Sequence, residues 1–385
     1  MSCVGRWRTF GTADLARFTA ALAPETRLLL GCARLTLTPA GRARLTALQG
    51  TGLDWDLAVD EACRHGLVPL LHHHAETLAL PATAVRRLER EFAAAARRSL
   101  ALTATLVDVL AALRAAGVGA TPFRGPALAV AAYGSVILRS FDGLDVLVHR
   151  ADVARAERVL AQRGYQPPDR GRGEVRAWVC GDVTVVLHCD LAPRWVGIGG
   201  VAGLWVRRRP LELGEARVPV PAPEDHLLLL TLHAAQRLWG RLGWLADVAA
   251  LLERHPGLDH FAVRDEARRH GVERLVRLGL GLAQALVEAP LPREVAAWVR
   301  RDRGLDDLVR TVCARRLRPA AAPPGLLECA RFHFRSRERW SDRVRDAGRG
   351  AGTMLAVPAR LAVRATSGLW ERGRRAAPVI PAFHR

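Results

Sequence analysis

Short β-like segments occur in only one part of this 385-residue chain, and that restriction limits the folds open to it. A helix-like stretch, Ala151–Gln162, lies among them. The β-like segments are Thr121–Phe123, Leu144–Val148, Val175–Val179 and Val183–His188. A doubly wound sheet would need many more strand–helix repeats. The pattern therefore predicts an α+β fold with one small sheet, flanked by N- and C-terminal helical segments.

Helical spacing on both sides of the strands divides the chain further. The longest helical pattern before the strands is Ala82–Ala116, and Gly117 ends it. After the strands, Pro223 marks the start of a new helical region. The predicted segments are an N-terminal helical segment (1–116), an α+β core (117–218), a helical domain (219–318) and an Arg-rich C-terminal helical tail (319–385).

All 57 residues counted as Lys or Arg are Arg, and the chain contains neither Lys nor Asn, as expected of a high-GC bacterial gene. The absence of Lys excludes Schiff-base, P-loop and lysyl-nucleotide mechanisms. Much of the net charge of +19 lies in residues 301–385, which hold 19 Arg and 8 acidic residues. This region is typical of a solvated helix surface, and its alternative uses are contact with an anionic membrane surface or a protein partner. A nucleic-acid partner is not expected, because basic and aromatic residues do not interleave in a sheet.

The seven Cys residues are widely spaced and form no Cys-x-x-Cys pair. This spacing predicts a reduced protein without a disulfide framework or a thiolate zinc site. No apolar stretch follows the N-terminal charges as in a signal peptide, and no run approaches the roughly 18 apolar residues of a spanning helix. We therefore expect a cytoplasmic protein.

The residues with the clearest chemical pattern surround the second predicted strand. In chain order they are Arg124, Gly125, Gly134, Ser135, Arg139, Asp142 and Asp145. Their order resembles the bacterial uncharacterised nucleotidyltransferase family, of the DNA polymerase β type superfamily, which is often encoded beside peptide natural-product genes. Leu160–Tyr165 and the helical block from Pro223 to Asp247 extend the resemblance, which covers roughly residues 25–260.

The resemblance implies a mixed sheet and Mg²⁺-dependent transfer of a nucleotidyl group from an NTP to a small molecule or peptide, as in natural-product biosynthesis. In that chemistry, carboxylates on one face of a strand hold the metal ions, and backbone N–H groups hold the triphosphate. The catalytic and metal positions correspond to Asp145, helped by Asp142 or Asp190. The nucleotide-binding positions correspond to Arg124, Gly125, Gly134, Ser135 and Arg139.

Three positions depart from the family's pattern. Gly143 stands where the first carboxylate of the pair belongs, Val186 where a third carboxylate belongs, and Arg124 where the family has Lys. His188 and Asp190 share strand parity with position 186, so Asp190 is an acidic replacement on that face. Two interpretations follow: an altered but working metal and nucleotide site, or a catalytically degenerate binding or regulatory protein.

Three further signals are interpreted as structural. The run His72–His74 cannot chelate one ion from a helix, because consecutive helical side chains point about 100° apart. We interpret His233 and Asp247 as a buried polar pair in a Leu- and Trp-rich core; the alternative is a helical wall facing the nucleotide. Asp182, beside Gly181, is predicted to form a hairpin turn.

Overall fold

The computed structural model describes residues 18–50, 52–167, 175–189, 202–302, 304–316 and 325–339. Residues 1–338 form one compact unit and residues 339–385 a second. The predicted candidate Asp190 and most of the Arg-rich tail lie outside the described residues. Within the described part, no helix is long and apolar enough to span a membrane.

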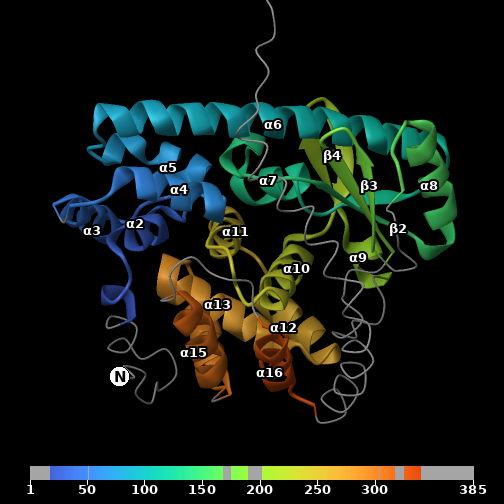
Figure 1. Cartoon of the computed structure of the whole chain (residues 1–385). Helices are drawn as coiled ribbons and strands as arrows, with labels where there is room; N and C mark the ends of the chain where they lie inside the picture. Colours follow the sequence, from blue (N-terminus) through green and yellow to red (C-terminus); the bar gives the residue numbers. More distant parts are fainter. Residues whose placement is uncertain are drawn as a thin grey trace, which may run out of the picture. The chain divides into compact units, whose positions relative to one another are not determined.

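The N-terminal region is helical, as predicted. Its elements are α2 (Pro24–Cys32), α3 (Pro39–Gln49), α4 (Trp55–His65), α5 (Val68–His73), the short 3₁₀ helix η1 (Ala75–Thr77) and α6 (Ala82–Ala115). Helix α4 begins where Asp54 accepts a hydrogen bond from the Leu57 amide at 3.0 Å, and it ends at Gly66, whose φ of +71° suits a glycine. The 34-residue α6 contacts α4 and α5, and also α7 and α8 of the core (Figure 1).

A four-stranded mixed sheet follows, and it confirms the α+β fold class. Its strands are β1 (Ala120–Pro122), β2 (Leu144–Val148), β3 (Val175–Cys180) and β4 (Val183–His188), in the order β1-β2-β4-β3. Only β2 and β4 are parallel, and in their register Asp145 pairs with Val186. The β3–β4 turn lies at Gly181 and Asp182, as predicted.

The remaining core elements surround this sheet. They are α7 (Pro126–Tyr133), η2 (Val136–Leu138), η3 (Arg150–Asp152), α8 (Val153–Gln162), α9 (Ala202–Arg207), β5 (Arg209–Leu213) and β6 (Ala216–Val220). The predicted helix over Ala151–Gln162 is therefore confirmed, with a 3₁₀ turn at its start. The β5–β6 hairpin was not predicted, because only Leu213 of β5 is buried and its sequence Arg-Pro-Leu-Glu-Leu has little β character.

Helices make up the described part of the chain after β6. They are α10 (Pro223–Gln236), α11 (Gly243–Arg254), α12 (His260–Arg269), α13 (Glu273–Val287), α14 (Arg293–Arg300), α15 (Leu305–Arg316) and α16 (Leu326–Ser336). Helix α13 contacts α10, α11, α12, α14, α15 and α2. It therefore links the helices after the sheet to the N-terminal region.

Two large hydrophobic clusters stabilise the fold, and α7 contributes to both. One cluster joins the sheet to α6 and α8, and includes Ala127 and Ala129 of α7. The other joins the N-terminal helices to α10–α16, and includes Leu128 and Ala132 of α7. Helix α7 thus fixes the loop that precedes it between the sheet and the helical region.

Candidate functional site

Arg124 lies in a sharp turn between β1 and α7, and Gly125 makes that turn possible. Gly125 has φ +57° and ψ −130°, a conformation that residues with a Cβ rarely adopt. A Cβ at this position would lie 2.9 Å from the carbonyl oxygen of Gly143, just ahead of β2. The close approach of these two backbones brings Arg124 beside the side chain of Asp145.

Asp145 on β2 is the acidic centre of the site. Its Oδ1 atom accepts hydrogen bonds from Nε2 of His188 at 2.8 Å and from Nη1 of Arg124 at 3.3 Å. The Asp145 side chain is 14% exposed. Burial alone would raise its pKa, but the positive charge of Arg124 and the hydrogen bond from His188 outweigh burial and hold the pKa well below its ordinary value. The carboxylate is therefore ionised at neutral pH.

His233 on α10 holds the other side of the Arg124 guanidinium. Its Nε2 atom lies 2.9 Å from Nη2 of Arg124, so the imidazole accepts this bond and carries its proton on Nδ1. Burial, followed by the nearby Arg124 and Arg237, holds the pKa of His233 well below its ordinary value. The ring of Trp244 packs edge-on against His233, with 5.3 Å between centroids. Arg124 is thus held between a carboxylate and a neutral imidazole.

A second polar network lies on the loop that leads into β2. Arg139 donates two hydrogen bonds to Asp247 on α11, from Nε at 2.7 Å and from Nη2 at 3.0 Å. The hydroxyl of Tyr133 donates a third, at 2.8 Å. Burial would lower the pKa of Arg139, but Asp247 outweighs that effect and raises it. The predicted pairing of His233 with Asp247 is therefore wrong: each is hydrogen-bonded to a different arginine.

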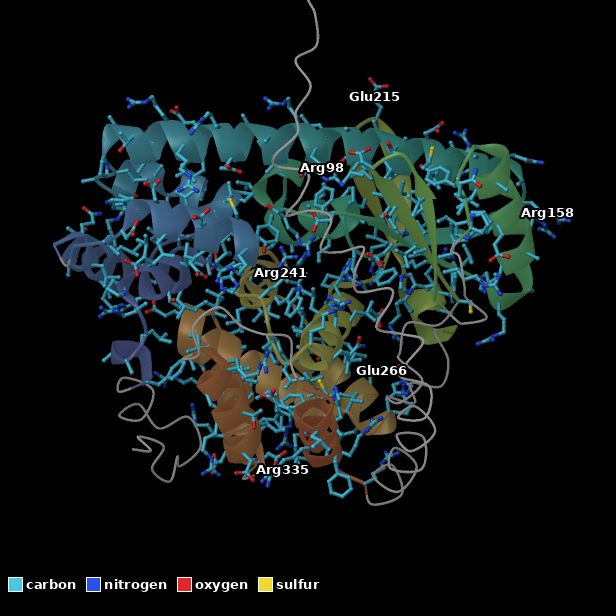
Figure 2. All side chains as sticks on the ribbon, viewed as in Figure 1. Arg98, Arg158, Glu215, Arg241, Glu266 and Arg335 are labelled. Carbon is cyan, nitrogen blue, oxygen red and sulfur yellow. The ribbon has the colours of Figure 1, made fainter. Side chains whose placement is uncertain are left out.

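Asp142 lies apart from Asp145. Its side chain is 68% exposed, and its carboxylate is 4.0 Å from Nη1 of Arg241. Its backbone carbonyl accepts a weak hydrogen bond from Arg98 at 3.5 Å; Figure 2 labels both Arg98 and Arg241. The structure thus gives Asp142 surface partners and does not bring it to the Asp145 carboxylate.

The remaining predicted phosphate-binding residues form the end of α7. Gly134 has φ +75° and ends the helix. Ser135 accepts a hydrogen bond from the Ile137 amide at 3.4 Å, which begins η2. A Cβ at Gly134 would lie 3.2 Å from the guanidinium of Arg254, so this turn lies next to a cation. Gly134 and Ser135 therefore shape the chain between Arg124 and Asp145.

The carboxylates described here do not fit a two-metal site. Of the predicted acids that the structure describes, Asp142 is exposed, and Asp145 has an Oδ1 atom that already accepts two hydrogen bonds. In the described part of the chain, no three His, Cys, Asp or Glu side chains are grouped as ligands of one metal ion. His188 is the partner that sequence reasoning missed: strand parity placed it on the correct face but gave it no role.

A family model shows the class of protein to which this α+β chain belongs. The family model described as "Uncharacterised nucleotidyltransferase" matches residues 51–288, more than half of the chain. The chain therefore belongs to that family. The comparison with curated proteins gave no match.

Among solved structures, the chain is similar to an antigenic nucleotidyltransferase-like protein from Paracoccidioides brasiliensis. The sequence identity is 17% and the TM-score is 0.34. The match covers 49% of this chain and 93% of that protein.

Proposed function

We propose that the protein binds the phosphates of a nucleotide at the Arg124–Asp145 site. The observation that carries this proposal is the Arg124 guanidinium, which is held by Asp145 and His233 and is 28% exposed. A guanidinium has five N–H donors, and two of them are used in these contacts. Within the described residues, the other three have no hydrogen-bond partner and can bind phosphate oxygens, for which an arginine fork is well suited.

Isothermal titration of the full chain with ATP, GTP, CTP and UTP, with and without Mg²⁺, tests the proposal. We expect at least one nucleotide to bind and Arg124→Ala to abolish the binding. Arg158→Ala is the matched control, because Arg158 is exposed on α8, at the edge of the view in Figure 2. If none of the four nucleotides binds under either condition, the proposal is wrong.

A second candidate function is Mg²⁺-dependent transfer of a nucleotidyl group from an NTP to a small molecule or peptide, as in natural-product biosynthesis. The parallel register favours it: β4 runs beside Asp145 and ends at His188, two residues before Asp190. This function would need Asp190 or Asp142 to join Asp145 in holding the metal. If neither acid joins Asp145 in holding a metal ion, the protein is a binding or regulatory member of its family.

Pyrophosphate release distinguishes these two roles. The assay supplies each NTP, Mg²⁺ and a panel of small-molecule and peptide acceptors. Transfer should be abolished by Asp145→Ala and by one of Asp190→Ala and Asp142→Ala, and unaffected by Arg158→Ala. Activity that survives Asp145→Ala would exclude this site as the catalytic centre.

A further inference from the structure

We infer that the site binds its nucleotide without a divalent metal ion, with Arg124 as the fixed cation for the phosphates. The inference rests on the proposed nucleotide binding and concerns the cation that such binding requires.

The Asp145 carboxylate already has two hydrogen-bond donors on one of its two oxygens. Oδ1 accepts from His188 at 2.8 Å and from Arg124 at 3.3 Å. A Mg²⁺ ion requires carboxylate oxygens at about 2.0–2.1 Å in octahedral geometry. An ion bound there would also lie next to the positive Arg124, and the two cations would repel each other strongly in this buried environment. The Asp145 carboxylate therefore suits the guanidinium better than it suits a metal ion.

The strand positions next to Asp145 that the structure describes supply no second carboxylate; Asp190 lies outside the described residues. Val186 is the residue paired with Asp145 across the β2–β4 ladder, so their side chains share a face of the sheet. Gly143 occupies the position two residues before Asp145, which has the same parity. On this face of the two strands, the other polar side chain in contact with Asp145 is the imidazole of His188. The described residues of this face thus offer cationic and neutral groups around one acid.

Arg124 is held as a rigid positive group. Nη1 is bound to Asp145, and Nη2 to the acceptor nitrogen of His233, so the plane of the guanidinium is fixed at two atoms. A lysine ammonium has no planar fork with which to bridge these partners while facing a ligand. Because the cation is already in position, the protein needs little reorganisation when an anion binds. A bound metal ion would otherwise supply such a fixed positive charge.

Isothermal titration of the full chain with ATP, in EDTA and in MgCl₂, tests the inference. We expect the Kd for ATP to agree within about threefold between the two buffers. Arg124→Lys should weaken binding about tenfold in both, because the ammonium keeps the charge but loses the bridge. Arg158→Ala should bind as the wild type does, and tripolyphosphate should compete with ATP if the phosphates are what Arg124 holds.

The outcomes separate this inference from the proposed function. ATP binding that appears only with Mg²⁺ overturns the inference and leaves nucleotide binding in place. Binding that is independent of Mg²⁺ but unchanged in Arg124→Lys also overturns it, because another group would then hold the phosphates. Absence of binding by all four NTPs in both buffers contradicts the proposed function itself.

Discussion

The buried charges of this protein are arranged in close pairs. Arg139 and Asp247 are the best example, because their side chains are 14% and 3% exposed and share two hydrogen bonds. Desolvating two charges costs several kcal/mol, and good geometry mainly offsets that cost. Removing one partner should therefore lower the free energy of unfolding by more than the intact pair contributes to it.

Asp247→Asn should strongly destabilise the protein. The substitution keeps the side-chain volume but leaves the buried Arg139 without a counter-ion, at an expected cost of about 3 kcal/mol. Urea unfolding followed by circular dichroism measures this loss. Asp265→Asn is the control: Asp265 pairs with Arg264 on the surface and should leave the free energy of unfolding unchanged. Equal effects of the two substitutions would contradict the role assigned to Asp247.

His226 on α10 should make the fold sensitive to mild acid. Burial lowers its pKa from 6.5 to about 4 in the folded protein, so the unfolded chain binds a proton that the folded chain does not. Its contribution to stability is complete above the unfolded pKa of 6.5 and falls as the pH decreases toward 4. Over that range the loss is about 3 kcal/mol. His226→Gln should reduce the difference in unfolding free energy between about pH 7 and pH 5. An unchanged difference would show that His226 does not cause the acid sensitivity.

The site was only partly predictable at the scale of residues. Asp145 and Arg124 could be found because they stand at positions that the family resemblance assigns to a metal ligand and to a nucleotide-binding cation. His233 lies 109 positions beyond Arg124, and no spacing rule connects them. His188 could be assigned to a face of β4 but not to a partner. Strand parity gives the face to which a side chain points, but it does not give the register of β4 against the neighbouring strand. The contacts that hold the guanidinium therefore had to come from the structure.

At the scale of elements, the register of β2 and β4 decides what surrounds Asp145. The strands were predicted to within one residue, since buried Val- and Leu-rich runs are a strong signal. Their pairing was not, because parallel strands are joined by long connections that carry no turn signal. The β5–β6 hairpin was missed for a different reason, since its exposed strand has no apolar alternation.

Val186→Asp should introduce metal dependence. The new carboxylate would project beside Asp145 from the paired position on β4 and supply a second donor for Mg²⁺. We expect ATP to bind about tenfold more tightly with Mg²⁺ than with EDTA in this variant. Val186→Asn is the matched control, because it has the same shape without the charge. Equal melting temperatures of Val186→Asp and Val186→Asn would show that the new acid does not disturb the fold. If the Kd of Val186→Asp for ATP is then the same with Mg²⁺ and with EDTA, position 186 is not adjacent to the nucleotide.

Helix packing around α13 depends on Gly279. A Cβ there would lie 2.5 Å from Cγ2 of Thr231 and 3.0 Å from the ring of the buried Trp239. Gly279→Ala should therefore destabilise the protein by about 1–3 kcal/mol, even though alanine favours a helix. Thermal melting provides the measurement. Gly257→Ala, where no atom lies within 4 Å of the added methyl group, should melt like the wild type. Equal melting of the two variants would contradict this packing.

At the scale of the molecule, the helices before and after the sheet share one hydrophobic cluster. Leu28 and Leu71 from the N-terminal region belong to the same buried group as Leu245 and Leu275. Sequence patterns divided these regions into separate segments because the composition changes at residues 117 and 219. Such changes do not show which helices pack against one another. The helices on the two sides of the sheet should therefore unfold together and not as separate domains.

The described interior ends within the Arg-rich tail (319–385), at α16 and the residues just after it. The hydrophobic clusters end at Phe332, and Arg274 donates hydrogen bonds to the carbonyls of Arg335 at 3.0 Å and Arg337 at 3.3 Å. A chain of residues 1–339 keeps all of these contacts. Its melting temperature should lie within about 2 °C of that of the full chain, and its Kd for ATP should be unchanged. A broad or lowered transition would mean that residues 340–385 contribute to the core.

The same truncation tests the charge of the tail. Residues 340–385 hold 9 Arg and 3 acidic residues, and a basic segment of this kind is attracted to anionic lipid headgroups. If the tail serves the alternative use, membrane contact, the full chain will co-sediment with phosphatidylserine vesicles at low salt and the 1–339 chain will remain in solution. Because this attraction is screened within about 8 Å at physiological salt, added NaCl should also release the full chain. If both chains sediment equally, the charge of the tail is only a solvated surface, and any lipid contact must come from the unit formed by residues 1–338.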